Sequence, residues 1–206
     1  MTRRDALQRQ ALKDLQEFHV LMIDGHFDYG NGFHGRLYLN PHQLFRQPAT
    51  IWRFAQDLLE MLPESLLSET DVVAGPVMGG ALLAHTMAGL LDARRSLTHP
   101  PTSFAPLSFD AATGLTLRSF YHQVVRGKRV LLADDVRNTG KTFERAKGLI
   151  EQAGGRVLAT VEIYDRLEPM MDVGVPNYAL AEYQAPENYP ADACPMCKNG
   201  EGITTF

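Results

Sequence analysis

Residues 130–142 read Val-Leu-Leu-Ala-Asp-Asp-Val-Arg-Asn-Thr-Gly-Lys-Thr, and this stretch decides the fold. Its apolar first part has the length and continuity of a strand that is buried on both faces. The strand delivers Asp134 and Asp135 to its carboxyl end, and a short loop then turns into a helix. We expect that helix to run from about Thr142 to Ala153, where two glycines close it.

The same stretch has the chemistry of a phosphate site. Backbone N–H groups at a helix start have no partner within the helix and attract anions. Thr139 and Thr142 add hydroxyl donors, and Gly140 lets the backbone approach a phosphate closely. Two carboxylates beside a phosphate would repel it unless they hold sugar hydroxyls or Mg²⁺. The pattern therefore favours a phosphorylated sugar with free hydroxyls.

Two other interpretations stay open from these residues alone. Gly140-Lys141-Thr142 looks like the end of a nucleotide-binding P-loop, but that motif needs a glycine where Asp135 stands. A plain strand, turn and helix with surface acids is the simpler alternative.

Outward from this stretch, strands alternate with helices. We expect helices at 3–17, 49–62, 80–91 and 142–153, strands at 71–74, 101–105, 129–133 and 156–164, a loop and hairpin at 24–41, and a mobile flap at 106–123. This order predicts an α/β fold with a mainly parallel sheet flanked by helices. Such sheets bind ligands at the carboxyl ends of their strands.

Two further segments fall at such strand ends. Residues 75–81, Gly-Pro-Val-Met-Gly-Gly-Ala, form a glycine-rich turn that exposes N–H groups to an anion, although such turns often serve only close packing. Tyr164-Asp165-Arg166 ends a later strand, where Arg166 is able to grip a planar carboxylate. A surface salt bridge is the commoner role of a single arginine.

Residues 130–142 resemble the signature by which type I phosphoribosyltransferases bind phosphoribosyl pyrophosphate (PRPP). The resemblance implies that Asp134 and Asp135 address the ribose hydroxyls as catalytic residues and hold Mg²⁺ indirectly. The implied 5′-phosphate cradle is Arg137, Asn138, Thr139, Gly140, Lys141 and Thr142, with Asn138 where threonine is more usual. The implied pyrophosphate loop is Pro76, Val77, Met78, Gly79 and Gly80.

Other segments, patchily over residues 20–200, are similar to the orotate phosphoribosyltransferases. They are Asp165-Arg166, Gly25-His26-Phe27, residues 33–39 and the tail Cys194-Pro195-Met196-Cys197. The resemblance implies that Arg166, Phe33 and His34 bind the acceptor base. It also implies a homodimer and a single domain: an N-terminal helix and small hood hairpin at 1–45, a core at 46–185 and a tail at 186–206.

The chain departs from that subfamily where catalytic cations are expected. Residues 104–110, Phe-Ala-Pro-Leu-Ser-Phe-Asp, contain neither lysine nor arginine, and Asp28-Tyr29-Gly30 stands near the expected hairpin lysine. The nearest basic groups are Arg118, His122, Arg94 and Arg95. Loss of one preorganised donor costs on the order of 10²–10³ in rate. A different acceptor, a cation from elsewhere or reduced activity would each account for the departure.

Bulk composition narrows the function classes. The chain has 206 residues, 45% hydrophobic and 21% charged, with a net charge of −4. We therefore expect no nucleic-acid or membrane partner and a cytoplasmic location. The only cysteines are Cys194 and Cys197. One such pair is half of a four-thiolate zinc site, so a reduced pair without metal is the simpler expectation, while histidines or a second subunit remain able to complete a site.

The resemblance, together with the chemistry of residues 130–142, implies a Mg²⁺-dependent enzyme that transfers ribose 5-phosphate from PRPP to a nitrogen of a small planar, orotate-like base and releases pyrophosphate. Two alternatives remain: a non-catalytic PRPP-binding regulator, and a transferase for a purine or another specialised base.

Overall fold

The computed structural model describes residues 2–30, 32–95, 99–167, 172–184 and 188–205. Its main body is a six-stranded sheet in the order β10-β9-β8-β5-β6-β7. The strands are β5 (Val72–Pro76), β6 (Ser103–Asp110), β7 (Gly114–Thr116), β8 (Arg129–Arg137), β9 (Arg156–Asp165) and β10 (Asn177–Glu182). All neighbours pair in parallel except β6 and β7, which form an antiparallel hairpin.

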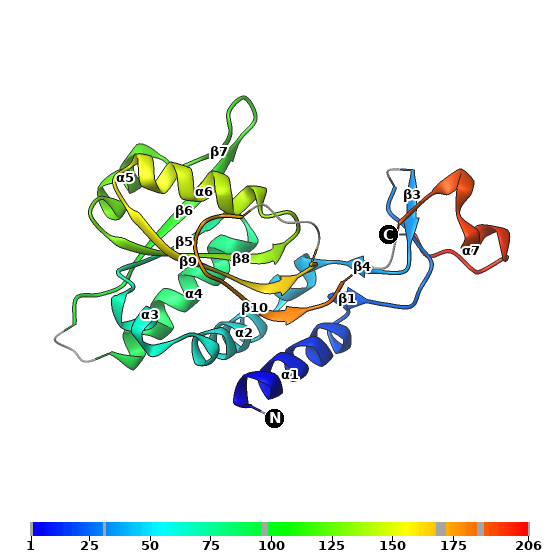
Figure 1. Ribbon diagram of the computed structural model, residues 1–206, viewed down its shortest axis with the longest axis horizontal. Coiled ribbons are helices and arrows are strands. Elements are labelled where there is room, and N and C mark those ends of the chain that lie inside the picture. The colour runs from blue at the N-terminus through cyan, green and yellow to red at the C-terminus, as the bar shows by residue number, and fades with distance from the viewer. Residues whose placement is uncertain (1, 31, 96–98, 168–171, 185–187, 206) are drawn as a thin grey trace.

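Helices cover both faces of this sheet (Figure 1). They are α1 (Arg3–Glu17), α2 (Pro48–Met61), α3 (Glu64–Glu69), α4 (Gly79–Arg94), α5 (Ser119–Val125) and α6 (Lys141–Gln152). The expected α/β architecture, a mainly parallel sheet flanked by helices, is confirmed.

The alternation of side chains along the strands divides the core into two layers. Val73 and Leu131 face the cluster built with α1, α2 and α4. Their neighbours Val72 and Leu132 face the cluster that includes Phe143 of α6. Because each central strand is buried on both faces, it is a continuous apolar run in the sequence.

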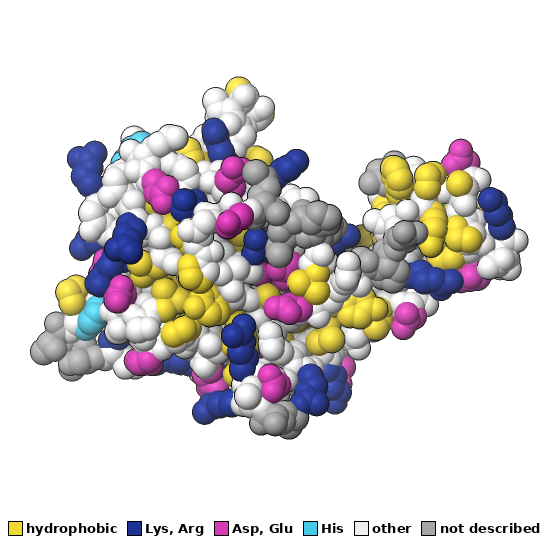
Figure 2. Space-filling view, in the orientation of Figure 1, with side chains coloured by type: hydrophobic (Ala, Val, Ile, Leu, Met, Phe, Trp, Pro, Cys, Tyr) yellow, Lys and Arg dark blue, Asp and Glu magenta, His cyan; other side chains and the backbone are white. Residues whose placement is uncertain are grey.

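The N-terminal hairpin region and the C-terminal tail form a small lobe beside the sheet. Its strands are β1 (Leu21–Met22), β2 (Phe27–Asp28), β3 (Phe33–Gly35), β4 (Tyr38–Leu39) and β11 (Tyr189–Pro190), and its short helices are η1 (Pro41–Arg46), η2 (Ala191–Ala193) and α7 (Pro195–Lys198). β1 pairs with β4, and the tail strand β11 joins β3 and β2 in one three-stranded sheet. The part with β3, α7 and the C-terminus projects from the main body (Figures 1 and 2).

Two expectations about local structure are corrected. The strand expected at 101–105 continues as β6 to Asp110 and turns into β7, so the segment 106–123, expected as a flap, contains a β-hairpin followed by α5. β8 does not end before its acids but continues through Arg137, because β9 pairs with it as far as Asp165. The expected boundary at residues 185–186 lies outside the described residues. In the described part of the chain, no helix has the length and apolarity needed to cross a membrane.

Candidate functional site

Asp134 and Asp135 lie together near the carboxyl end of β8. Asp134 is 8% exposed, and Asp135 is half-buried. The Asp134 side chain accepts a hydrogen bond from the Asp135 backbone at 2.9 Å. Burial, together with the Asp135 carboxylate, raises the pKa of Asp134 well above its usual value. A cation or hydroxyl donors bound between these two acids would stabilise the ionised form of Asp134.

Three cavities meet at this pair of acids. The largest has a volume of about 550 Å³ and includes Asp135 in its wall. A second, of about 220 Å³, is lined by both acids, and a third, of about 100 Å³, is lined by Asp134. Because the cavities share wall residues, they form one branched site at the carboxyl edge of the sheet, the place expected for a ligand.

The smallest cavity lies at the start of α6. Its wall contains Asp134, Val136, Arg137, Asn138, Thr139, Gly140, Lys141, Thr142 and Phe143. Gly140 caps the helix with φ 80°, a left-handed conformation that suits glycine, and no side chain accepts from the first N–H groups. Those donors and the helix dipole give this cavity the chemistry that suits an anion.

Arg137 supports the same interpretation of the smallest cavity. The residue ends β8 rather than lying in the loop, and only 6% of it is exposed. Its Nε and Nη1 atoms have no hydrogen-bond partner within the described residues. A buried guanidinium with open donors in a cavity wall favours an anionic ligand there.

The middle cavity lies at the start of α4. Its wall contains Pro41, His42, Phe45, Pro76, Val77, Met78, Gly79, Phe109, Asp134, Asp135 and Thr142. α4 also begins without a side-chain cap, so no side chain accepts hydrogen bonds from its first N–H groups. A Cβ atom at Gly80 would lie 2.7 Å from the Ala133 carbonyl oxygen, and one at Gly79 would overlap the Asp135 carboxylate. The glycines therefore let α4 approach β8 closely.

The shortage of cations expected from the sequence is visible in this cavity. Among the described residues that line it, His42 is the only one with a basic side chain. Arg95 donates to Thr70 and Leu67 carbonyls, and His122 contacts the Leu117 carbonyl at 3.0 Å, so both are used in packing away from the site.

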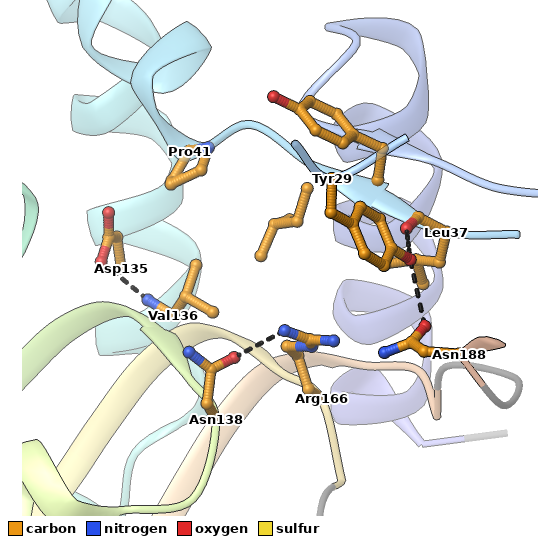
Figure 3. Close-up of a pocket in the computed structure, with 10 residues that line it drawn as sticks. Tyr29, Leu37, Pro41, Asp135, Val136, Asn138, Arg166 and Asn188 are labelled. Atoms are coloured by element: carbon orange, nitrogen blue, oxygen red, sulfur yellow. Dashed lines mark hydrogen bonds between the residues drawn. The ribbon is translucent and has the colours of Figure 1, made fainter. Parts of the chain in front are cut away.

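The largest cavity lies between the sheet and the small lobe (Figure 3). Arg166 points into it from the end of β9, and its Nη1 donates to the Asn138 side chain at 3.2 Å. Tyr29 closes the opposite side, where its hydroxyl contacts the Leu37 carbonyl at 2.6 Å and Asn188 Oδ1 at 3.1 Å. Burial raises the pKa of Tyr29, so its hydroxyl stays protonated at neutral pH.

Two residues predicted to bind the acceptor lie elsewhere. Phe33 is 45% exposed on β3, and His34 is 7% exposed and turned toward His26 and the two cysteines. Neither residue is among those that line the cavity, because both lie on β3, in the three-stranded sheet with β2 and β11. Leu37, Tyr38 and Leu39 do line the cavity, and they lie in the segment 33–39 whose resemblance pointed to the base. The sequence assigned no site role to the wall residues Tyr29 and Asn188. Tyr29 and Asn188 had no local signal, because they meet across 159 residues of sequence.

A parallel sheet with two acids and two uncapped helix starts at its carboxyl edge defines a class of α/β proteins suited to phosphorylated ligands. Residues 44–183 match the family model of the phosphoribosyl transferase domain, and the chain belongs to that family. The expected resemblance is thereby confirmed.

Individual relatives agree with this assignment. The chain is 32% identical over 174 residues to an orotate phosphoribosyltransferase of Erythrobacter litoralis, covering 84% of each chain. A solved orotate phosphoribosyltransferase from Aeropyrum pernix superposes with a TM-score of 0.61 at 20% identity, over 82% of this chain and 92% of that one. An adenine phosphoribosyltransferase from Rhodothermus marinus gives a TM-score of 0.61 at 20% identity, over 85% and 99%. Both structures show a shared fold.

Proposed function

We propose that the chain is a phosphoribosyltransferase that moves ribose 5-phosphate from PRPP to a ring nitrogen of orotate or a closely similar base. The observation that carries this proposal is the junction of three cavities at Asp134 and Asp135. PRPP has a 5′-phosphate, a ribose and a pyrophosphate, and the acceptor is a fourth part. The three cavities would hold the 5′-phosphate, the pyrophosphate and the base, and the acids where the cavities meet would hold the ribose.

Each branch suits one part. The start of α6, with Arg137 to Thr142, takes the 5′-phosphate through backbone N–H groups and hydroxyls. The start of α4, with Pro76 to Gly80, takes the pyrophosphate. Asp134 and Asp135 accept hydrogen bonds from the ribose hydroxyls at the junction. The cavity of about 550 Å³ remains for the base.

Arg166 sets the acceptor preference toward an acid. Its guanidinium lines the base cavity beside Tyr29 and Asn188, where a planar carboxylate receives two parallel hydrogen bonds. Orotate is a planar ring with such a carboxylate. The relatives at about 30% identity that carry the orotate name support this choice.

Mg²⁺ fits the donors at the junction. Hard carboxylate oxygens are its preferred ligands, and it is usually held by one or two of them together with substrate phosphates. Asp134 and Asp135 supply two such groups, and burial makes the ionised form of Asp134 costly without a cation. Bound with PRPP, Mg²⁺ would neutralise charge on the leaving pyrophosphate.

The protein itself contributes position and charge. Two helix starts hold the ends of PRPP, and the wall with Arg166 holds the base, so both reactants are aligned before reaction. The bond between ribose C1 and the pyrophosphate oxygen breaks as the bond to the ring nitrogen forms, and the proton of that nitrogen leaves with the pyrophosphate. The products are a nucleoside 5′-monophosphate and pyrophosphate.

Binding and turnover test separate parts of this proposal. Titration calorimetry with PRPP and Mg²⁺ should show binding to the wild type and at least about tenfold weaker binding to Asp134→Asn/Asp135→Asn, because hydrogen bonds to charged groups contribute about 1.5–3 kcal/mol. Arg156→Gln, at the opposite end of β9, is the control and should bind normally. Equal affinity in the double variant would refute the assigned junction.

A base panel then identifies the acceptor. Consumption of PRPP with orotate, and little with uracil, adenine or hypoxanthine, is the expected result. Turnover with a purine alone would move the proposal to a purine transferase.

A non-catalytic PRPP-binding regulator remains the second candidate. The observation in its favour is the middle cavity, where His42 is the only basic side chain among the described wall residues. Tight PRPP binding with no nucleotide formed from any base would support it. Any turnover that is abolished by the Asp134→Asn/Asp135→Asn change would exclude it. A homodimer and a cytoplasmic location, expected from the sequence, stay predictions.

A further inference from the structure

A second cluster of reactive side chains lies in the small lobe, outside the three cavities. His26 directly precedes β2, and His34 lies in β3. Cys194 caps the start of α7, and Cys197 lies within that helix. One ligand atom from each residue lies within 4.8 Å of the others. We infer that these four side chains form a structural zinc site that fastens the C-terminal tail to the N-terminal hairpin.

The distances between the ligand atoms fit a single tetrahedral ion. With Zn–N near 2.0–2.1 Å and Zn–S near 2.3 Å, tetrahedral geometry sets N–N at about 3.3 Å and N–S at about 3.6 Å. The structure has 3.2 Å between His26 Nε2 and His34 Nδ1. His26 Nε2 lies 3.6 Å from each cysteine sulfur, and His34 Nδ1 lies 3.3 Å from Cys197 Sγ. The two remaining pairs of ligand atoms also lie within 4.8 Å of each other, so all four atoms are gathered around one small volume.

The surroundings of the histidines fix the nitrogens that face this point. His26 Nδ1 lies 3.0 Å from the Glu201 carbonyl oxygen, which accepts a hydrogen bond and leaves Nε2 with its lone pair. His34 Nε2 lies 3.9 Å from Asp28 Oδ1, on the residue opposite it in the β2–β3 pair. A carbonyl or carboxylate behind each ring is the arrangement that zinc-binding histidines use.

The types of ligand indicate which metal binds, and the number of protein ligands indicates its role. Two thiolates and two imidazoles in a tetrahedron favour zinc. His26, His34 and Cys194 are buried, and Cys197 is exposed at the edge. Four protein ligands leave no open position for a substrate or water, so the site is structural rather than catalytic.

The outer part of the small lobe, built from β2, β3, β11 and α7, contributes no buried residue to the core clusters of the main body. Its strands β2, β3 and β11 have two or three residues each. Phe27, Cys194 and Met196 are buried in the lobe, but none of them belongs to either core cluster of the main body. Units with so little apolar burial usually need a metal or disulfides, and both cysteines here are free thiols.

Metal content of the full-length chain is the direct test. Protein expressed with zinc and dialysed against metal-free buffer should retain about one zinc per chain, the stoichiometry of a four-ligand site. Cys194→Ser/Cys197→Ser should lose it. His19→Asn, an exposed histidine on the far side of β1, is the matched control and should retain it. Asp28→Asn should weaken zinc binding by about tenfold through His34.

Spectra and thiol chemistry of the wild type keep the test independent of whether a variant folds. Cobalt in place of zinc should give the visible absorption of a tetrahedral site with sulfur ligands, and zinc should slow thiol modification of the native protein. Zinc-free protein whose thiols react equally fast with and without added zinc would refute the site. A Cys194–Cys197 disulfide in the isolated protein that persists in a reducing buffer with zinc would refute the site as well. Neither result depends on transferase activity.

Discussion

Arg166 places a planar cation in the wall of the proposed base cavity. Arg166→Ala should raise the KM for orotate by about 10- to 100-fold, because hydrogen bonds to charged groups contribute about 1.5–3 kcal/mol. Arg166→Lys keeps the charge but loses the two-pronged geometry, so its KM should be intermediate. Steady-state kinetics at saturating PRPP measure both values.

The KM for PRPP separates this role from general damage to the fold. It should change little in either variant, and Arg145→Ala, at an exposed position on α6, should leave both KM values unchanged. An unchanged KM for orotate in Arg166→Ala would show that another group holds the carboxylate.

Glu162 is a second residue with a measurable consequence. It is fully buried on β9, and burial raises its pKa to about 8 although Asn177 donates to its carboxylate at 2.7 Å. Since the folded pKa lies above the unfolded value, the favourable contribution is complete below about pH 4.5 and is lost as the pH rises toward 8. Glu162→Gln, which resembles the protonated form, should therefore exceed the wild type in stability by at least roughly 1 kcal/mol at pH 8.

Chemical denaturation at pH 5, 6.5 and 8 measures this difference. The gap between the two proteins should widen with pH. Glu64→Gln, an exposed change on α3 whose charge does not act on Glu162, should show no such trend. A constant gap would mean that Glu162 is ionised across the range.

At the scale of elements, the approach of α4 to β8 depends on glycine. A Cβ at Gly80 would lie 2.5 Å from Pro76 Cδ and 2.8 Å from Asp134 Oδ1. Gly80→Ala should destabilise the protein by about 1–3 kcal/mol through overpacking and should weaken PRPP binding, because the helix start shifts from the acids.

Gly89 in the same helix provides the matched control. Nothing lies within 4 Å of a Cβ built there, so Gly89→Ala should stabilise the protein by roughly 0.5–1 kcal/mol without affecting binding. Thermal unfolding and PRPP calorimetry check both changes. Normal stability in Gly80→Ala would contradict the close approach.

The elements that the sequence predicted well are those with local signals. Helices α1, α2, α4 and α6 and the strands β5, β8 and β9 follow from apolar periodicity, glycine turns and charged boundaries. The extension of β6 and its hairpin with β7 inside the expected flap were not predicted, because polar side chains alternate there on a partly exposed surface. The strand at Asn177–Glu182 was not predicted at all.

The residues of the candidate site likewise include some with a local sequence signal and some without one. Asp134, Asp135 and the two helix starts were located from contiguous motifs, and the structure brings them together. Tyr29 and Asn188 were missed, and Phe33 and His34 were wrongly placed at the cavity, because a hairpin and a distant tail decide which side chains face inward. Long-range pairing of short strands leaves little trace in either segment alone.

At the scale of the whole molecule, the shortage of cations in the middle cavity favours a second subunit. A homodimer would let a neighbouring chain bring a lysine or arginine to the pyrophosphate, which no described wall residue supplies. Light scattering should therefore give twice the monomer mass, and specific activity should fall on dilution below the dimer dissociation constant. Full activity of a monomer at all concentrations would contradict this prediction.

The joining of Tyr29 to Asn188 also bears on how the protein is made. A ribosome completes the segment from Pro76 to Thr142 long before it reaches Asn188, so a nascent chain is able to fold a donor pocket while the acceptor pocket still lacks a wall. Proteolysis or a stop codon between Tyr183 and Asn188 would keep the segments proposed to bind PRPP but would remove Asn188 from the wall of the base cavity. Loss of the last residues would thus leave a chain that still binds PRPP but holds the base poorly.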